Sequence, residues 1–283
     1  MKEIIKVDHL AYTYPAMEGE TGVRVFEDLS LTVEEGSFVA VLGSNGCGKS
    51  TLAKHFNAIL LPSGGKVYVC GIDTANEERI IHVRRNVGMV FQNPDNQIVA
   101  NVVEEDVAFG PENLGVSSPE IRHRVNRALK QVGMYEYREH APHLLSGGQK
   151  PRIAIAGVIA MEPEVLILDE PTAGLDPASR AGILENIETY RRAKNATIMM
   201  VSHSMNDVAR LTDRLLVLCG SRLAMDGAPS EVFTRAQELL DMGLDIPDIT
   251  RVFLRLQQMG LPLEPVYTID QAIAAVKNLK EGK

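Results

Sequence analysis

Short apolar runs alternate with longer segments of helical character along most of the chain. Ser37–Leu42, Val165–Asp169 and Ile198–Ser202 are almost continuously apolar, which is typical of short strands buried on both faces of a sheet. Thr51–Phe56 and Ala178–Lys194 have helical character and each follows one of these runs. Because strands that alternate with helices form parallel sheets, the pattern predicts an α/β fold.

The segments around this core differ in pattern. Residues 4 to about 91 are expected to add N-terminal antiparallel strands to the first buried strand. Residues 93 to about 161 are mainly helical, and Ser118 is an N-cap, followed by Pro119, that opens a helix ending at Val132. Arg214–Gly227 predicts a hairpin. The chain therefore combines a mixed or parallel sheet with a separate helical subdomain.

The last part of the chain predicts three short helices after Asp226–Phe233. Apolar residues at helical spacing mark two of them: Ile249, Val252, Phe253, Leu256 and Met259 in one, and Ile269, Ile273, Val276 and Leu279 in the other. Thr268 and Gln271 form a capping box that opens the last helix. Large apolar side chains gain about 1.5–3 kcal/mol each when fully buried, so both stripes need a cover. They form either a helical cap on the rest of the chain or a surface for dimerisation.

Composition limits the classes of protein. The chain has 283 residues, 45% of them hydrophobic and 23% charged, which suits one sizeable core with a smaller appendage. A net charge of −8 argues against a general nucleic-acid surface. No apolar run approaches the ~18 residues needed to cross a bilayer, the N-terminus lacks the apolar core of a signal peptide, and the three scattered cysteines fit a reducing compartment. These features predict a cytosolic chain that reaches a membrane only through a partner.

A phosphate-binding loop follows the first buried strand. Gly43, Ser44, Asn45, Gly46, Cys47, Gly48, Lys49 and Ser50 fit the pattern G-x-x-x-x-G-K-[ST], and Thr51 continues into a helix. Strand, glycine loop and helix N-terminus together make an anion site, with Lys49 reaching the β- and γ-phosphates and Ser50 ligating Mg²⁺. The loop therefore predicts binding of ATP or GTP with Mg²⁺. The Cys47 thiol has two interpretations: the converging N–H groups beside Lys49 lower its pKa and make it reactive, or it lies beneath the loop and is inert.

A second motif narrows the class of nucleotide-binding protein. Leu145-Ser146-Gly147-Gly148-Gln149 precedes an apolar helix at Ile153–Ala160. The strand Val165–Asp169 follows, and Glu170 comes directly after it. In order and spacing these motifs resemble the ATPase subunits of ABC transporters, over at least Ile4 to Gly227. The resemblance implies that Ser146, Gly147, Gly148 and Gln149 close over the γ-phosphate of an ATP held by the other subunit.

The same resemblance implies roles for six further residues. Tyr14 would stack on adenine, with Tyr12 competing for that role, and Gln92 would touch Mg²⁺ and the attacking water. Asp169 would hold Mg²⁺, and Glu170 would polarise the attacking water. Asp176 would link the two ATP sites, and His203 would contact the γ-phosphate.

Pro151, just after the signature motif, departs from the family pattern. The family usually has a residue other than proline there, often Gln. Pro lacks an N–H but is tolerated in the first turn of a helix, where N–H groups have no intrahelical partner. If the helix begins at Ser146, Pro151 lies past that turn and removes one hydrogen bond or bends the helix.

Three further stretches narrow the resemblance to one kind of transporter. Phe91–Gln97 (FQNPDNQ), Glu104–Asn113 and the C-terminal tail resemble the ATPases of energy-coupling-factor (ECF) transporters over nearly the whole chain, closest to the first of two paralogous ATPase subunits. This implies pairing with the second ATPase, or with another copy, on the cytoplasmic face of the membrane. It also implies a transmembrane coupling protein, and a substrate-capturing membrane protein for a vitamin, cobalt or nickel. The acidic residues Glu104, Glu105 and Asp106 form either a groove for arginines of the coupling protein or a solvated turn.

The sequence thus predicts an ABC ATP-binding domain over residues 1–227, with its helical subdomain at about 93–161, and a C-terminal helical extension over residues 228–283. The leading hypothesis is an ATP-hydrolysing subunit of an ECF-type importer of vitamins or transition-metal ions. The alternatives are the ATPase of a conventional ABC importer, or a soluble ABC ATPase that acts on nucleic acid or ribosomes. Duplicated cassettes, long coiled coils and basic arms would favour the last class, and the sequence has none of them.

Overall fold

Two sheets form the framework of the residues that the computed structural model describes, 2–15 and 22–280. Residues 16–21 of the predicted ATP-binding domain and 281–283 of the predicted extension lie outside this range. An antiparallel sheet has the order β2-β1-β4-β5, with β1 (Glu3–Tyr14), β2 (Val23–Glu34), β4 (Gly64–Val69) and β5 (Ile72–Asp73). A six-stranded sheet has the order β10-β9-β3-β8-β7-β6, with β3 (Phe38–Gly43), β6 (Val87–Val90), β7 (Val165–Asp169), β8 (Thr197–Val201), β9 (Arg214–Cys219) and β10 (Arg222–Gly227). The predicted α/β fold with N-terminal antiparallel strands is confirmed.

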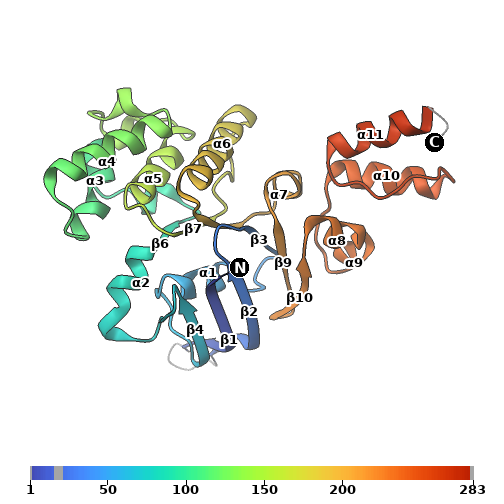
Figure 1. The fold of residues 1–283 in the computed structure, drawn as a ribbon, viewed down its shortest axis with the longest axis horizontal. Coiled ribbons are helices and arrows are strands. Elements are labelled where there is room, and N and C mark those ends of the chain that lie inside the picture. The colour runs from blue at the N-terminus through green and yellow to red at the C-terminus, as the bar shows by residue number, and fades with distance from the viewer. Residues whose placement is uncertain (1, 16–21, 281–283) are drawn as a thin grey trace.

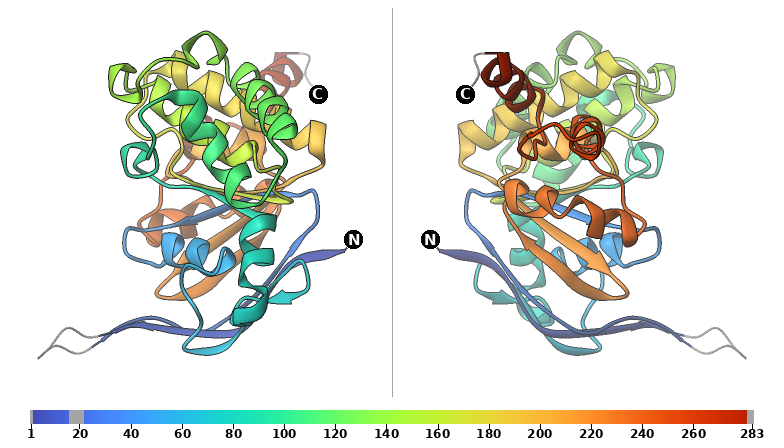
Figure 2. Two further views of the ribbon diagram at one scale, coloured as in Figure 1. Left: turned by 90° about the vertical axis from the view of Figure 1, so that its left-hand side faces the viewer. Right: turned by 90° about the vertical axis from the view of Figure 1, so that its right-hand side faces the viewer.

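Helices cover both faces of the six-stranded sheet. Figure 1 shows α3, α4, α5 and α6 on one side of this sheet, and α1, α2 and the antiparallel sheet on the other. Their bounds are α1 (Lys49–Phe56), α2 (Ile80–Asn86), α3 (Val103–Asn113), α4 (Ser118–Gln131), α5 (Gln149–Ile159), α6 (Pro177–Lys194) and α7 (Met205–Leu211). The two side views in Figure 2 show the same layers edge-on. None of the helices in the described part of the chain combines the length and apolar character needed to span a membrane.

Strand β3, which leads into the phosphate loop, lies between two hydrophobic cores. All six of its residues are buried, and successive side chains alternate between the faces of the sheet. Phe38, Ala40 and Leu42 belong to the core on the helical side, while Val39 and Val41 belong to the core shared with α1 and the antiparallel sheet. A strand buried on both faces needs a continuous apolar run, which is the pattern seen in the sequence.

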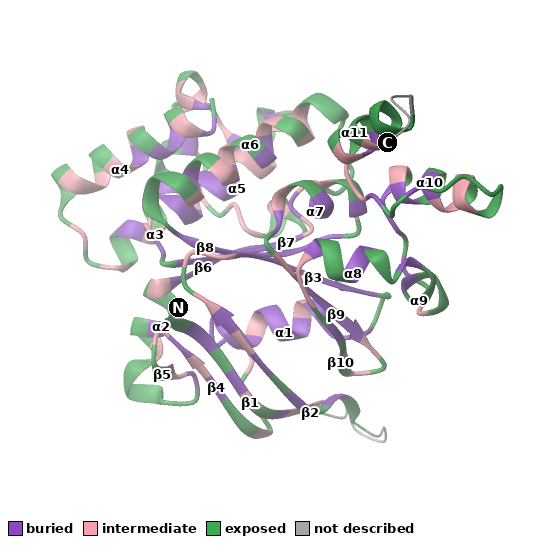
Figure 3. Ribbon diagram, turned by 45° about the vertical axis from the view of Figure 1, so that its right-hand side comes forward, coloured by how far each residue is buried: buried purple, intermediate pink, exposed green. Residues whose placement is uncertain are grey.

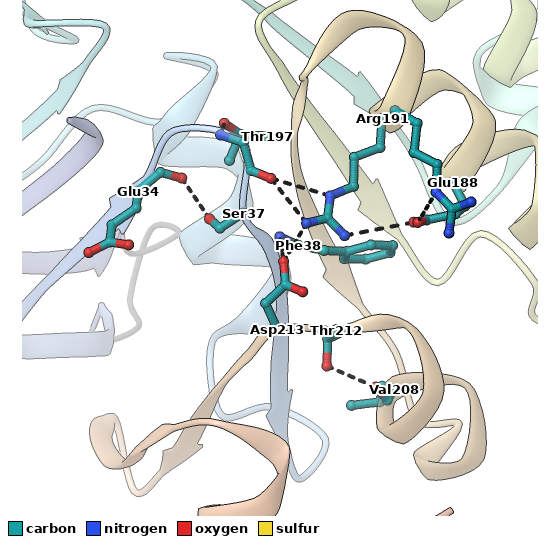
Figure 4. A network of polar contacts seen from close by, with 11 residues as sticks. Glu34, Ser37, Phe38, Glu188, Arg191, Thr197, Val208, Thr212 and Asp213 are labelled. Carbon is teal, nitrogen blue, oxygen red and sulfur yellow. Dashed lines mark hydrogen bonds and ion pairs between the residues drawn. The ribbon is translucent and has the colours of Figure 1, made fainter. Parts of the chain in front are cut away.

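Arg191 of α6 holds the N-terminal end of β3 in place. Its guanidinium donates to the carbonyl of Gly36 at 3.1 and 3.3 Å and to Oδ2 of Asp213 at 2.5 Å (Figure 4). The same Asp213 oxygen accepts the backbone N–H of Phe38 at 2.9 Å, and the guanidinium lies 5.7 Å from the Phe38 ring centroid. One arginine thus joins α6 to the turn before β3 and to the start of β9.

The three helices predicted after Phe233 are confirmed as α9, α10 and α11, and the described C-terminal part adds a further short helix, α8, before them. The bounds of the four are α8 (Pro229–Thr234), α9 (Ala236–Asp241), α10 (Asp248–Gln258) and α11 (Ile269–Lys280), and α8 covers part of the segment expected to precede the predicted three. The predicted capping box forms, because the side chains of Thr268 and Gln271 each accept the other residue's backbone N–H at 3.4 and 3.3 Å.

The apolar stripes of α10 and α11 are only partly covered. Phe253, Leu263, Val266 and Ala272 make a small core of their own between the two helices. Other large apolar residues of this region are exposed: Val252, Met259, Ile269, Ile273, Val276 and Leu279. Figure 3 shows α11 as largely exposed. In the described chain these helices therefore do not act as a cap that buries both stripes on the ATP-binding core.

Two helix starts differ from expectation in detail. Helix α4 begins at Ser118 with Ser117 as its N-cap residue, so Ser118 is one position inside the helix, beside Pro119. Helix α5 begins at Gln149, which puts Pro151 in its first turn. The N–H of Lys150 already donates to the carbonyl of Ser146 at 3.2 Å, so the turn before Gln149 is helical too, and the next bond of this pattern, to the Gly147 carbonyl, is absent because Pro151 has no N–H.

Candidate functional site

The phosphate loop joins the C-terminal end of β3 to the N-terminus of α1. Gly48 is the residue that requires glycine here: its φ is +102°, and a Cβ would lie 2.6 Å from Cζ of Phe26. Lys49 is buried, and its Nζ donates to the carbonyl oxygens of Gly43 at 2.8 Å and Ser44 at 3.0 Å. The loop thus curves around its own lysine, with α1 directing its N-terminal N–H groups toward the same place.

One cavity of about 340 Å³ collects most of the predicted nucleotide-binding residues. Its wall includes Tyr14, Asn45, Gly46, Gly48, Lys49, Ser50, Thr51, Gln92, Asp169, Glu170 and His203. These residues come from β1, the phosphate loop, α1 and the ends of β6, β7 and β8. The C-terminal ends of parallel strands meet at one edge of a sheet, where open α/β sheets bind ligands. Gly43, Ser44 and Cys47 belong to the loop but not to the cavity wall.

Tyr12 and Tyr14 were both candidates for the residue that stacks on adenine, and they differ in burial. Tyr12 is 7% exposed, and its ring packs edge-on against His55 with centroids 4.7 Å apart. Tyr14 lines the cavity, and its hydroxyl lies 3.1 Å from Oγ1 of Thr51. Only Tyr14 therefore has a face that a base can reach.

Glu170 and His203 meet at the edge of the cavity. Oε1 of Glu170 lies 3.2 Å from Nε2 of His203, and Oε2 accepts the His203 backbone N–H at 3.4 Å. Burial raises the pKa of the Glu170 carboxyl above its usual value, and the nearby His203 opposes that shift. Oε1 itself is enclosed, and its contact with the His203 ring falls short of hydrogen-bond geometry. A partly buried carboxylate with a raised pKa at the wall of this cavity suits a general base.

The oxygen atoms around the phosphate loop suit a hard cation. A hydroxyl from Ser50, an amide oxygen from Gln92 and a carboxylate from Asp169 line the same cavity. Mg²⁺ prefers oxygen ligands and is bound in nucleotide sites by one or two protein groups together with the phosphates. The donor set therefore fits Mg²⁺.

The signature residues lie apart from this cavity. Gly147 and Gly148 line a second cavity of about 250 Å³, together with Gln92, Glu170 and Asp176. The signature turn is closed by Gln149, whose Oε1 accepts the backbone N–H of Ser146 at 2.8 Å.

Asp176, the predicted link between ATP sites, is the N-cap of α6. Its Oδ1 accepts the N–H groups of Ala178 and Ser179, both at 3.0 Å. Hydrogen bonds from Ser179 lower the pKa of the Asp176 carboxyl. Gly148 packs on the same turn, because a Cβ there would lie 2.6 Å from Oγ of Ser179. The signature turn and the start of α6 are thus in direct contact.

The stretch after Gln92 contains two positioning contacts that sequence reasoning did not identify. Gln97 accepts the Phe91 N–H at 3.0 Å and donates to the carbonyl of Ala154 at 3.1 Å, which joins the end of β6 to α5. Lys150 pairs with Asp95 at 2.6 Å. The FQNPDNQ sequence was a marker of resemblance, but only the fold shows that it ties the glutamine loop to the signature helix.

The prediction of a lowered pKa for Cys47 was wrong, and the alternative of a thiol beneath the loop fits the structure. The thiol is 7% exposed, and burial raises its pKa above the usual value. Lys49 and backbone N–H groups act in the opposite direction and do not compensate. The side chain lies beneath the loop, because a Cβ on Gly43 would come within 2.4 Å of its sulfur.

The acidic cluster divides into two parts. Glu104, Glu105 and Glu112 line a cavity of about 400 Å³ between α3 and α4, together with two arginines, Arg122 and Arg138. Asp106 does not belong to it: the residue is buried, and its Oδ1 accepts the N–H groups of Val99 and Ala100. Asp106 therefore orders the loop before α3, and two of the three predicted acidic residues remain in the groove.

Fold and site together define the class of protein. A phosphate loop, a strand ending in Asp169-Glu170 and a signature turn beside α6 are the parts of an ATP-binding cassette. The family model for ABC transporters matches residues 26–173.

Similar proteins narrow the family. The chain is 49% identical to the energy-coupling factor transporter ATP-binding protein EcfA1 of Clostridium perfringens, over 99% of both chains. The solved structure of cbiO1 from Clostridium perfringens, part of the ABC transporter complex cbiONQ, has a TM-score of 0.75 at 36% identity, over 92% of this chain and 98% of that one. A dimeric ATP-binding cassette in a post-hydrolysis state, bound to ADP and Pi, has a TM-score of 0.71 at 27% identity, over 80% and 98%. The chain belongs to the ATP-binding proteins of energy-coupling factor transporters.

Proposed function

We propose that this chain hydrolyses MgATP and uses the energy to drive an ECF-type importer of vitamins or transition-metal ions. The observation that carries the proposal is the single cavity shared by the phosphate loop, Asp169, Glu170 and His203. Phosphoryl transfer to water needs a cradle for the phosphates, a positioned water and groups that stabilise the developing charge. These residues supply all three.

Each group has a distinct task in this proposal. Lys49 and the loop N–H groups hold the β- and γ-phosphates, and Tyr14 offers its ring to adenine. Ser50, Gln92 and Asp169 hold Mg²⁺, which neutralises charge on the β- and γ-oxygens when bound. Glu170 accepts a hydrogen bond from the attacking water, and His203 contacts the γ-phosphate.

We further propose that the complete site needs a second ATPase subunit. The signature residues Gly147 and Gly148 line a different cavity from the phosphate loop, so they are free to close over a nucleotide on a partner chain. Residues 1–227 form the ATP-binding domain in this proposal, and residues 228–283 form an extension that pairs with the partner's. The exposed apolar residues of α10 and α11 support this pairing. The partner is the paralogous ATPase or a second copy of this chain.

The membrane partner binds at the acidic groove in this proposal. Glu104, Glu105 and Glu112 offer three carboxylates between α3 and α4, against the two arginines Arg122 and Arg138 of the same cavity, and this excess of negative charge suits arginines of a transmembrane coupling protein. The chain then lies at the cytoplasmic face of the membrane as a peripheral subunit, and a separate membrane protein captures the substrate.

Two substitutions test the chemistry. Glu170→Gln removes the base and leaves the phosphate loop intact, so ATP binding should persist while turnover falls about 100-fold or more. Lys49→Ala should instead weaken ATP binding, because the phosphates lose their cationic contact. Nucleotide affinity and phosphate release are measured on both variants, paired with an equally substituted partner. Normal hydrolysis by Glu170→Gln would refute the assignment of the base.

Affinity purification from detergent-solubilised membranes tests the transport role. A tag on this chain should co-purify hydrophobic membrane subunits and a second ATPase. Glu105→Arg should reduce the yield of membrane subunits, since it reverses one charge of the groove, while the exposed Glu136→Arg serves as a control outside it. Purification of the wild-type chain without membrane subunits would refute the transport proposal.

A further inference from the structure

The segment that carries His203 is held by contacts from three sides. Glu170 contacts the ring and backbone of His203 from the end of β7. Arg180 of α6 pairs with Asp207 at 2.6 Å and also donates to Oγ of Ser204. Ser204 is the N-cap of α7 and lies directly after His203. These contacts join the histidine to the catalytic carboxylate and to the helix that follows Asp176.

The third contact comes from the C-terminal extension. Nδ2 of Asn206 donates to Oδ2 of Asp248 at 2.6 Å, and the backbone N–H of Asp248 donates to Oδ1 of Asn206 at 3.1 Å. Asn206 is the second residue of α7, and Asp248 is the first residue of α10. The amide group of Asn206 therefore forms one hydrogen bond with the side chain of Asp248 and one with its backbone N–H.

Catalytic residues and the extension also share one cavity. A hollow of about 530 Å³ is lined by Glu170 and His203 on one side and by Asp245, Ile246 and Asp248 on the other. The connection between α9 and α10 therefore forms part of the wall around His203. No other part of the described extension contributes to the wall of this cavity.

We infer that Asn206 and Asp248 are a positioning pair for ATP hydrolysis, which ties the location of His203 to that of the C-terminal extension. The inference rests on the proposed ATPase function. It adds that the extension affects the chemical step through this pair, in addition to any contact it makes with a partner subunit.

The geometry gives the reason. Helix α7 has seven residues and is about 10 Å long, so it moves as one short rod. Asn206 lies three positions after His203, and a shift of the helix start moves both residues together. Misplacing a catalytic group by about 1 Å can cost on the order of 100-fold in rate, whereas the phosphate loop that binds ATP lies on a different element. Loosening the pair should therefore lower kcat and leave ATP affinity nearly unchanged.

A charge exchange tests the pair in the full-length chain, purified with the subunits that accompany it. Asn206→Asp puts two carboxylates together and should lower kcat for ATP about 5-fold or more, with KM within about 2-fold of wild type. The double variant Asn206→Asp/Asp248→Asn restores both hydrogen bonds. The new carboxylate at position 206 accepts one bond from the backbone N–H of residue 248 and one from the new side-chain amide of that residue. The kcat of the double variant should return to within about 2-fold of wild type.

A matched control lies in α9 of the same extension. Gln237 donates to Asp241 at 2.9 Å, and both residues are exposed and absent from the cavity wall. Gln237→Glu creates the same clash of carboxylates and should leave kcat unchanged. If Asn206→Asp fails to fold, Asn206→Ala removes both hydrogen bonds without adding charge and should show the same loss confined to kcat.

The outcomes separate this inference from the proposed function. In one outcome the wild-type chain hydrolyses ATP, Glu170→Gln abolishes this hydrolysis, and the Asn206 variants keep a normal kcat. This result overturns the positioning pair and leaves the proposed function standing. A double variant no better than Asn206→Asp, or a loss that falls on KM, also overturns it. Absence of hydrolysis in the wild-type chain with its partners overturns the proposed function itself.

Discussion

Replacing Arg191 with alanine should destabilise the sheet that carries the phosphate loop. The side chain is 21% exposed and reaches Gly36, Phe38 and Asp213 from α6 (Figure 4). In the variant the Gly36 carbonyl loses its charged donor, and the turn before β3 loses its connection to α6. The start of β3 is the part of the site's framework most affected.

The magnitude follows from the individual contacts. Hydrogen bonds from a charged donor to the Gly36 carbonyl contribute about 1.5–3 kcal/mol, and the contact with the Phe38 ring adds about 0.5–1 kcal/mol. The Asp213 side chain is 52% exposed, so solvent screening limits that ion pair to about 1 kcal/mol or less. Because contacts within one network are not additive, we expect a net loss of about 2–4 kcal/mol in the free energy of unfolding.

Urea unfolding at pH 7 measures this loss, and Arg192→Ala is the matched control. Arg192 is the next residue of α6, its side chain is 79% exposed, and among the described residues it pairs only with Glu188. Its removal should cost about 0.5 kcal/mol or less. A loss for Arg191→Ala that is no greater than for Arg192→Ala would show that the network does not stabilise the strand.

Three further predictions concern the loop, a buried histidine and the extension. Gly48→Ala should abolish ATP binding, measured by calorimetry, because the methyl group meets Phe26 at a left-handed backbone position; unchanged affinity would contradict the loop geometry. Burial lowers the pKa of His55, whose Nδ1–H donates to the carbonyl of Thr51 while Nε2 has no hydrogen-bond partner in residues 2–15 and 22–280, so the unfolded chain binds the proton more readily. The free energy of unfolding should therefore decrease as the pH is lowered below about 6.5, the ordinary histidine pKa. In urea unfolding from about pH 7.5 to 5.5, His55→Gln should lose less stability than the wild-type chain, and equal losses in the two proteins would contradict the assignment. Ile273→Asp on the exposed face of α11 should weaken nucleotide-free association with the partner ATPase in sedimentation experiments while leaving the unfolding midpoint unchanged, and equal association would contradict the pairing surface.

The sequence predicted those parts of the site that depend only on residues close together in the chain. The phosphate loop is contiguous, and its function depends on glycine conformations and N–H groups within eight residues, so its pattern is specific. The buried strands were predicted within one residue at each end, because a strand covered on both faces must be apolar throughout. Asp169 and Glu170 followed from their place at the end of such a strand.

Tertiary structure decided which groups meet and which are exposed. Cys47 and Asp106 had local surroundings that suggested a reactive thiol and a docking carboxylate, yet burial and two backbone N–H groups gave each a structural role. The pair Asn206–Asp248 joins residues 42 positions apart, and no pattern in the sequence marks it.

The exposed faces of α10 and α11 show the same division. Helical spacing of the apolar residues determined that both helices have an apolar stripe, but spacing cannot say what covers it. Only the fold shows that part of the two stripes is buried in the small core around Phe253, while Ile269, Ile273 and Val276 are exposed. The physical reason is that secondary structure follows from neighbours along the chain, whereas burial depends on surfaces that the complete fold brings together.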